Sequence, residues 1–430
     1  VFVHFGGASA KKSGLLDTVL DALKAENIDY VTLGGVQANP TLAMAKEGIE
    51  LGKKEGVDFI LAVGGGSVID SAKCIADGIA NPDVDETFCE EYHQVCKDLS
   101  NLLGTDNETY VLGGEGILAL EAACATLTEP GDKVLVIDNG IFGRGFADFV
   151  SLYGGEPTLY TVDYHYPIVI EDLAEYLKEN HDFKYATVVH CDTPSGVLND
   201  ISKICPLLKQ YGILTVVDAV ASMFGEDVKV NEWQIDVICG GSQKALSAPP
   251  GLAFVTVSED AMKVMESRKT KVASFYCNIL AFKNYYKDKW FPYTMPISDI
   301  YGLCEAVRLV KEDTERVARH HKIAGAVRKA VKEAGLSLYL DYGDSATVTV
   351  INVPQGLRDI DIINTMKDKY GILISGCFDV LAGKVIRLGH MGNNARVEKV
   401  ADMLSAFTKA LNDLGFSCRC DMKESFYRSL

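Results

Sequence analysis

The first eighty residues alternate between short apolar runs and longer segments whose apolar positions recur at helical spacing. The runs predict strands at 1–5, 28–33 and 58–63, and the segments between them predict helices at 15–24 and 40–55. Alternation of this kind is typical of parallel strands joined by crossover helices. The front of the chain is therefore predicted to be a small α/β unit.

The pattern changes after Asn81-Pro82-Asp83, where an amphipathic helix is predicted at 86–103. Beyond that helix, apolar runs again alternate with helical segments, which predicts a second, larger α/β unit with a mainly parallel sheet. Its predicted strands lie at 109–112, 133–137, 156–160, 186–190, 214–218, 237–239 and 251–257.

A long helical stretch at 297–335 leads into a smaller unit near the carboxyl terminus. Apolar runs at 346–353 and 385–388 alternate there with a helix after Asp359 and a closing helix at 397–414. This last unit is predicted to be a small α/β domain.

Composition limits the classes of partner. The chain has 430 residues, 48% of them hydrophobic, which is enough for a large core. Its 42 basic and 59 acidic residues give a net charge of -17, which repels nucleic acid and anionic membranes. The 12 cysteines form no paired motif, so we expect reduced thiols in a cytoplasmic protein and neither a disulfide framework nor a metal site. No apolar stretch reaches the roughly 18 residues of a membrane span.

The strongest candidate for chemistry is Lys244, in the sequence Gly-Gly-Ser-Gln-Lys-Ala-Leu. It follows an apolar run, 213–217, that ends in Asp218. The aldehyde of pyridoxal phosphate condenses with an amine, and its ring withdraws electrons only while a carboxylate keeps the ring nitrogen protonated. A buried strand-end acid followed by a lysine therefore indicates a pyridoxal-phosphate enzyme.

Several further motifs occur around this pair. The turn Gly113-Gly114-Glu115-Gly116-Ile117 precedes a predicted helix, whose first amides can bind a phosphate. An aromatic residue, Phe142, follows the next strand, and a loop beginning at His190 contains Thr193. For His190 we favour a packed, hydrogen-bonded residue at a strand end over a functional one.

Together these motifs, in this order, resemble the class V aminotransferases of the alanine–glyoxylate, serine–pyruvate type, over about 86–416. The resemblance implies the type I pyridoxal-phosphate transferase fold. It also implies a division into an amino-terminal fragment, a large cofactor-binding domain, a small carboxyl-terminal domain and a tail, which we place at 1–82, 83–312, 313–416 and 417–430.

The resemblance also implies roles for single residues. Lys244 would form an imine with pyridoxal 5′-phosphate and then move the substrate's proton, and Asp218 would pair with the ring nitrogen. Phe142 and Val220 would cover the two faces of the ring, and Thr193 would bond its hydroxyl. The phosphate would be held by Gln243 and by backbone groups of Glu115, Gly116 and Ile117, although a glutamate is unusual there, since its carboxylate must point away from the phosphate or be offset.

Two more residues are assigned by the resemblance alone. Thr294, in Phe291-Pro292-Tyr293-Thr294, would reach the phosphate of a neighbouring subunit, which implies a homodimer. Arg387 would bind the substrate carboxylate through two parallel hydrogen bonds. His390, just beyond it, is either at the pocket rim or structural.

The front of the chain resembles a different family. Gly64-Gly65-Gly66-Ser67 after the third strand, and Asn39-Pro40-Thr41 earlier, are similar to the nucleotide-binding domain of iron-containing alcohol dehydrogenases over about 1–80. The metal ligands of that family lie in a later helical domain that this chain lacks. We therefore expect a fused fragment without dehydrogenase activity.

The sequence thus predicts an aminotransferase that moves an amino group from an amino acid to a small 2-oxo acid such as glyoxylate or pyruvate. One alternative is a lyase or desulfurase with the same cofactor, for which Cys377 is the candidate sulfur carrier. A second alternative is a catalytically impaired fusion that binds cofactor or nucleotide, because the dehydrogenase-like fragment stands where the related enzymes have a short arm beside the substrate pocket.

Overall fold

The computed structural model describes residues 1–7, 9–37, 41–80 and 84–430. Contacts divide the chain into two units. One consists of Val1–Tyr92 and Pro296–Ser298, and the other of His93–Met295 and Asp299–Leu430. The glycines at 64–66 lie in the first unit and the residues predicted to bind a cofactor lie in the second. The prediction for 39–40 falls outside the described residues.

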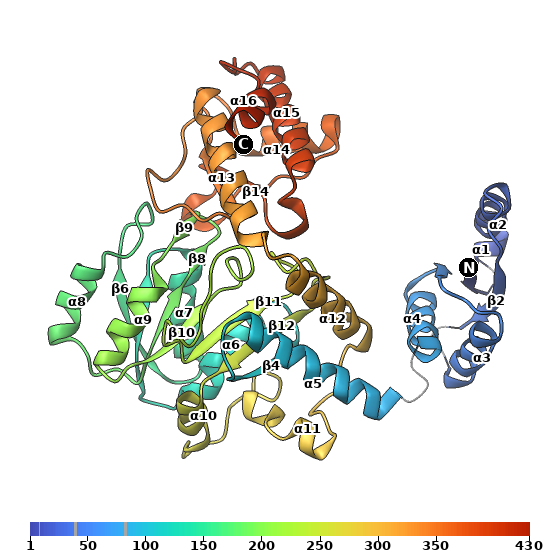
Figure 1. Cartoon of the computed structure of the whole chain (residues 1–430), viewed down its shortest axis with the longest axis horizontal. Helices are drawn as coiled ribbons and strands as arrows, with labels where there is room; N and C mark the ends of the chain where they lie inside the picture. Colours follow the sequence, from blue (N-terminus) through green and yellow to red (C-terminus); the bar gives the residue numbers. More distant parts are fainter. Residues whose placement is uncertain (8, 38–40, 81–83) are drawn as a thin grey trace. The chain divides into compact units, whose positions relative to one another are not determined.

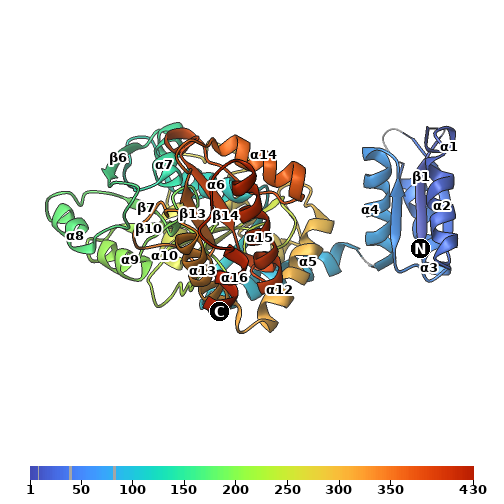
Figure 2. The same ribbon diagram turned by 90° about the horizontal axis from the view of Figure 1, so that it is seen from above.

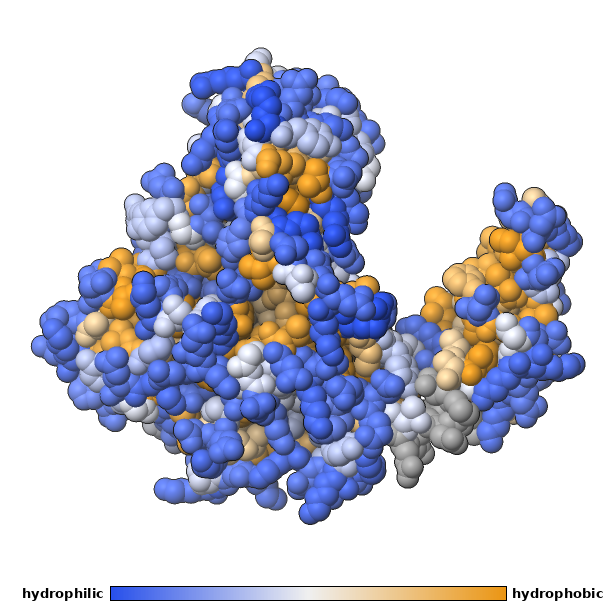
Figure 3. All heavy atoms as spheres, in the orientation of Figure 1, coloured by the Kyte–Doolittle hydropathy of each residue, from blue (hydrophilic) through white to orange (hydrophobic). Residues whose placement is uncertain are grey.

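The first unit is a three-stranded parallel sheet with helices between its strands, as predicted (Figure 1). The strand order is β2-β1-β3, and Figure 2 shows the sheet between α2 and α4. Apolar residues form a band on the face of this unit that Figure 3 shows. Its elements are β1 (Phe2–Gly6), α1 (Ser9–Lys12), α2 (Leu15–Ala25), β2 (Val31–Val36), α3 (Leu42–Lys54), β3 (Ile60–Val63) and α4 (Gly66–Ala80).

The second unit is built on a seven-stranded mixed sheet in the order β4-β12-β11-β10-β7-β5-β6. β12 is antiparallel to both of its neighbours, and the other strands run in one direction. The carboxyl ends of β4, β5, β7, β10 and β11 therefore lie at one edge of the sheet, where open α/β sheets bind ligands. The strands are β4 (Glu108–Gly113), β5 (Lys133–Asp138), β6 (Glu156–Thr161), β7 (Tyr185–Val189), β10 (Leu214–Asp218), β11 (Val237–Gly241) and β12 (Leu252–Val257).

Helices cover this sheet and bury its central strands completely. α6 packs on β11 and β12, and α7 packs on β5 and β6. The helices of this region are α5 (Val84–Leu102), which runs across the boundary between the two units in the sequence, α6 (Gly116–Leu127), α7 (Ile141–Leu152), α8 (Ile170–Glu179), α9 (Ile201–Gln210), α10 (Glu259–Glu266) and α11 (Tyr285–Asp288). A short hairpin, β8 (Cys191–Asp192) with β9 (Val197–Leu198), follows β7.

The helical stretch predicted at 297–335 is interrupted. It forms α12 (Ile297–Glu312) and α13 (Arg316–Glu333). Asp313 and Thr314 stand at the break, and their short polar side chains compete with the helix for backbone hydrogen bonds. The Asp313 carboxylate accepts bonds from both Nη atoms of Arg319, at 2.8 and 2.5 Å, which holds the two helices at the turn.

The carboxyl-terminal part is a two-stranded antiparallel sheet covered by helices (Figures 1 and 2). It contains β13 (Val348–Asn352), α14 (Asp359–Tyr370), β14 (Val385–Gly389) and α15 (Val397–Asp413). The last helix, α16 (Met422–Ser429), lies within the segment predicted as a tail. Met422 and Phe426 are fully buried in the core beside α13 and α15, which makes α16 part of this domain's packing.

None of the helices in the described parts of the chain combines the length and apolar character of a membrane span.

Candidate active site

A pocket lies at the carboxyl edge of the large sheet. Its lining brings together residues from the ends of four strands and the starts of two helices, which are far apart in the sequence. They are Glu115, Gly116, Ile117, Leu120, Phe142, Cys191, Thr193, Asp218, Val220, Ala221, Gln243 and Lys244. Of the residues predicted from the sequence as a site, Thr294 and Arg387 are not among them.

Asp218 ends β10 and is 5% exposed. Its Oδ1 accepts a hydrogen bond of 2.8 Å from the amide of Val220. Burial raises the pKa of this carboxyl to about 7, and the charge of Asp192 adds to the rise, while Lys244 opposes it. An acid in such a position is stabilised as the anion by a cationic partner in the pocket.

Lys244 is half-buried and lies three residues beyond the end of β11. The turn that carries it is fixed by its neighbours: Ser242 Oγ donates to the carbonyl of Pro249 at 2.6 Å, and Arg316 donates to the carbonyl of Ala245. In the described parts of the chain, Nζ of Lys244 takes part in no hydrogen bond or ion pair. A rigid turn thus presents an uncommitted amine to the pocket that also contains Asp218.

Gln243 and two glycines form the wall between β11 and α6. Oε1 of Gln243 is buried and has no hydrogen-bond partner within the structure as described. A Cβ on Gly241 would come within 3.1 Å of that oxygen, and one on Gly116 would come within 2.7 Å of Val220. Side chains at these glycines would crowd the pocket, so the glycines let the two backbones approach.

Glu115 is the N-cap of α6, and its Oε1 accepts a bond of 3.1 Å from the amide of Ile117. The carboxylate is therefore hydrogen-bonded to one of the helix amides that are predicted to bind the cofactor phosphate. The side chain is exposed, so it can rotate into solvent.

Phe142 is held by Asp192, a residue that the sequence analysis did not single out. Oδ1 of Asp192 accepts from the amide of Phe142 at 3.0 Å, and Oδ2 accepts from the hydroxyl of Ser195 at 2.8 Å. Asp192 is fully buried, and burial raises its pKa. This carboxylate fixes the start of α7 and the loop that contains Thr193.

A substitution of Gly140 tests this arrangement. Its backbone is extended, so alanine is allowed there, but the new Cβ would lie 2.3 Å from Cγ of Asp192. We expect Gly140→Ala to lower the free energy of unfolding by about 1–3 kcal/mol, as overpacked buried sites do. Thermal or urea unfolding measures this directly.

Gly145→Ala, on the same helix, is the matched control, because a Cβ there meets no atom within 4 Å. It should leave stability unchanged or raise it through helix propensity. Equal losses from both substitutions would show that Asp192 has no special place in the site.

Comparisons with known proteins agree with this geometry. Residues 79–389 match the family described as Aminotransferase class-V. An uncharacterized aminotransferase from Methanocaldococcus jannaschii is 38% identical over 76% of this chain and 88% of the relative. The chain belongs to the class-V aminotransferases.

Two relatives of this aminotransferase carry names that specify a reaction. Pyridoxamine–pyruvate transaminase from Mesorhizobium japonicum is 33% identical over 77% of this chain and 86% of the relative. Alanine–glyoxylate aminotransferase from Callithrix jacchus is 34% identical over 70% and 75%. The crystal structure of pyridoxamine-pyruvate aminotransferase from Mesorhizobium loti matches with a TM-score of 0.77 at 31% identity, covering 81% of this chain and 90% of that one. The predicted type I pyridoxal-phosphate fold is thereby confirmed.

The front of the aminotransferase chain is a separate match. Residues 1–102 match the family described as Iron-containing alcohol dehydrogenase, which confirms the predicted resemblance of the front of the chain to that family and suggests a fusion. Gly66 begins α4, as the glycine-rich turn predicts. Nucleotide binding by this unit stays a prediction.

Class-V aminotransferases use pyridoxal 5′-phosphate, and the pocket fits this cofactor. The buried Asp218 carboxyl suits a protonated ring nitrogen. The Oε1 atom of Gln243 has no partner among the described residues, and the glycines at 116 and 241 keep Cβ atoms out of the wall. Glu115 opposes the phosphate, since its carboxylate must leave the Ile117 amide for the phosphate to bind there.

Thr294 and Arg387 lie outside this pocket lining. Thr294 is exposed, and its role toward a neighbouring subunit stays a prediction. Arg387 is on β14, where its Nε donates to the carbonyl of Gly376 at 2.8 Å. Its role in binding a substrate carboxylate also stays a prediction.

The two histidines singled out in the sequence are packed residues. His190 lies edge-on to Trp233, with ring centroids 5.8 Å apart, and burial lowers its pKa to about 4. His390 is fully buried and its Nε2 lies 2.8 Å from Thr349 Oγ1, which favours the structural reading. Burial likewise raises the pKa of the Cys377 thiol, and this disfavours the thiolate that a sulfur carrier needs.

Proposed function

We propose that this aminotransferase moves the amino group of an amino acid to a small 2-oxo acid such as glyoxylate or pyruvate. The observation that carries the proposal is the meeting of Lys244 and Asp218 in one pocket with Phe142 and Val220. The cofactor supplies an aldehyde that takes up amino groups and a ring that withdraws electrons. The names of the relatives support the choice of oxo acids.

Lys244 has two tasks in this proposal. Its Nζ would hold the cofactor covalently, and as a free amine it would take and return the proton at the substrate Cα. The turn fixed by Ser242 and Arg316 would position Nζ for both tasks.

The remaining residues orient the ring and the substrate. Asp218 stabilises the protonated ring nitrogen, and Thr193 bonds the ring hydroxyl. Phe142 and Val220 would pack against the ring and exclude water. Gln243 and the backbone of Glu115, Gly116 and Ile117 would hold the phosphate, with Thr294 of a second copy in a homodimer. Arg387 would bind the substrate carboxylate.

A half-reaction screen tests the proposal. Purified holoenzyme is offered amino acids one at a time, and the absorbance of the lysine-bound cofactor is followed. At least one donor should convert the cofactor to its amino form, and glyoxylate or pyruvate should restore the first spectrum. Failure of every amino acid to change the spectrum would contradict the proposal.

A second candidate function is favoured by Glu115. Its carboxylate caps α6 at the place where a phosphate dianion would bind. The two negative charges would be close together and would repel each other. A pyridine substrate without the phosphate, such as pyridoxamine, meets no such repulsion. The pocket would then transfer the amino group of pyridoxamine itself to pyruvate, the reaction that names one relative.

Substitution of Glu115 separates the two candidates. If pyridoxamine is the substrate, the wild-type protein should bind pyridoxal at least as tightly as pyridoxal phosphate. Glu115→Gln should then increase the affinity for pyridoxal phosphate about tenfold. Equilibrium titration followed by absorbance gives both affinities. Glu171→Gln, in the first turn of α8, is the control for loss of a helix-start carboxylate. The second candidate would be excluded if the wild-type protein binds pyridoxal phosphate tightly and Glu115→Gln leaves that affinity unchanged.

A further inference from the structure

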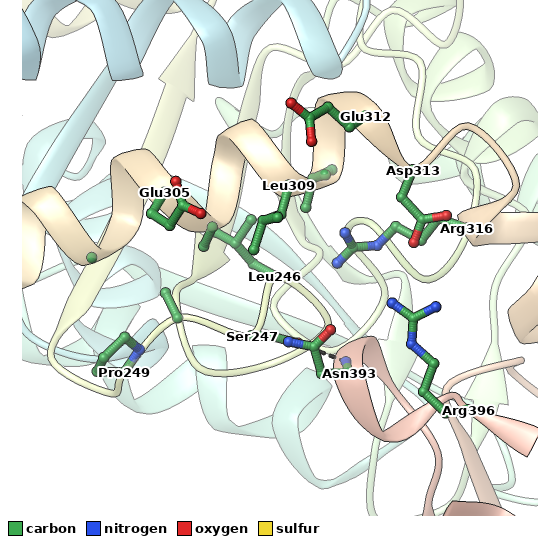
Figure 4. A pocket seen from close by; sticks show the side chains of 14 residues that line it. Leu246, Ser247, Pro249, Glu305, Leu309, Glu312, Asp313, Arg316, Asn393 and Arg396 are labelled. Carbon is green, nitrogen blue, oxygen red and sulfur yellow. Dashed lines mark hydrogen bonds between the residues drawn. The ribbon is translucent and has the colours of Figure 1, made fainter. Parts of the chain in front are cut away.

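A second pocket lies behind the turn that carries Lys244 (Figure 4). One wall is the segment Leu246–Pro249, another is α12, and the third is formed by Asn393 and Arg396, just before α15. The wall near Pro249 and Leu309 is apolar, and the other end holds two arginines, Arg316 and Arg396. Apart from Arg316, which fixes the turn carrying Lys244, the residues of this pocket have no role in the proposed transamination.

Arg316 is buried at the floor of this pocket, with 8% of its surface exposed. Its Nε donates to the carbonyl of Phe224 at 2.6 Å, and an Nη donates to the carbonyl of Ala245. Burial lowers the pKa of the guanidinium to about 10, Asp313 opposes this, and the charges of Arg319 and Arg396 add to it. The guanidinium also lies over the ring of Phe224, 5.9 Å from its centroid. A buried cation without an ion pair is stabilised by an anion.

Arg396 extends toward the same space from the residue before α15 (Figure 4). It is exposed, and across the described ranges it forms no ion pair or hydrogen bond through its side chain. Arg316 is the first residue of α13 and Arg396 is the N-cap of α15, so the positive ends of two helix dipoles are near the guanidinium groups.

The carboxylates on the pocket wall are engaged elsewhere. Asp313 is bound by both Nη atoms of Arg319. Glu305 and Glu312 are both bound by Arg308, at 2.7 and 2.5 Å, on the exposed side of α12. These outer charges are screened by water, whereas Arg316 is not. Among the described residues, neither Arg316 nor Arg396 forms an ion pair with a carboxylate, although the charge of Asp313 acts on both.

We propose that this pocket binds a phosphate-type dianion between Arg316 and Arg396. Two guanidinium groups match the charge of a phosphate, and their planar donors match its oxygen atoms. The apolar wall at Pro249 and Leu309 can take the organic part of a phosphate ester, so the ligand is either the free ion or an ester. The site is separate from the cofactor pocket.

Calorimetric titration of the holoenzyme tests this proposal. The cofactor is in place, so its own phosphate site is filled, and ionic strength is held constant. Inorganic phosphate and phenyl phosphate are the two probes. We expect both to bind; tighter binding of phenyl phosphate identifies an ester as the ligand class, and equal affinities identify the free ion.

Two variants make the result specific. Arg396→Gln should weaken phosphate binding about tenfold or more, as loss of a charge-assisted hydrogen bond does. Arg358→Gln removes an exposed arginine of the same domain that pairs with Asp361, and it should leave binding unchanged. Absence of phosphate binding, or equal weakening by the two variants, would overturn the proposal.

Discussion

Replacement of Lys244 by alanine is expected to reduce transamination by about a thousandfold or more. The substitution removes both the covalent attachment of the cofactor and the amine that takes the Cα proton, and general acid–base groups alone contribute about 10²–10⁴-fold. Steady-state kinetics with the best amino donor from the half-reaction screen measures the loss. The absorbance band of the lysine-bound cofactor should disappear as well.

The matched control is Lys263→Ala, which removes an exposed lysine on α10 from the same unit. It should retain wild-type activity and spectrum. Normal turnover by Lys244→Ala would show that a different amine performs the reaction.

Replacement of Asp218 by asparagine is expected to lower turnover by about a hundredfold or more. The amide has the shape of the carboxyl group but cannot stabilise a protonated ring nitrogen, so the ring withdraws electrons less strongly. Cofactor should still bind, because the contacts proposed for Gln243, Gly116 and Phe142 do not involve this carboxyl group. Single-turnover kinetics with the loaded variant separates the chemical step from binding.

The same variant makes a pH-dependent prediction for the cofactor-free protein. The folded-state pKa of Asp218 is raised to about 7, above the roughly 3.9 of an unfolded chain, so the folded state holds this proton longer. Its contribution to stability is present at low pH and is lost as pH rises through about 7. Unfolding of the cofactor-free proteins at pH 5 and pH 8 should show Asp218→Asn gaining stability relative to wild type at the higher pH. An identical difference at both values would mean that Asp218 is ionised throughout.

The sequence was most informative where chemistry and position coincide. Asp218 ends one buried strand and Lys244 follows the next, and the carboxyl ends of neighbouring strands meet at one edge of the sheet. The same rule predicts that the glycine turn before α6 and the loop with Thr193 lie near these residues, and both line the same pocket. The alternation of strands and helices likewise predicted both α/β units.

Features that depend on contacts between residues far apart in the sequence could not be predicted. Asp192 was missed because its partner, the amide of Phe142, is 50 residues away, and no local pattern connects them. The one signal was an acid in an otherwise buried strand-end loop. The sequence raised the conflict between Glu115 and a phosphate, but only the structure shows its carboxylate on the amide of Ile117. α16 was missed because its short polar sequence buries only a few side chains, among them Met422 and Phe426.

The account depends on a covalent bond between Lys244 and the cofactor, and chemical trapping tests that bond most directly. Borohydride reduction of the holoenzyme, followed by digestion and mass spectrometry, fixes the cofactor on the lysine that carries it. The account predicts the added mass on the peptide that contains Lys244, and its absence from the Lys244→Ala protein. Recovery of the mass on another lysine would contradict the account.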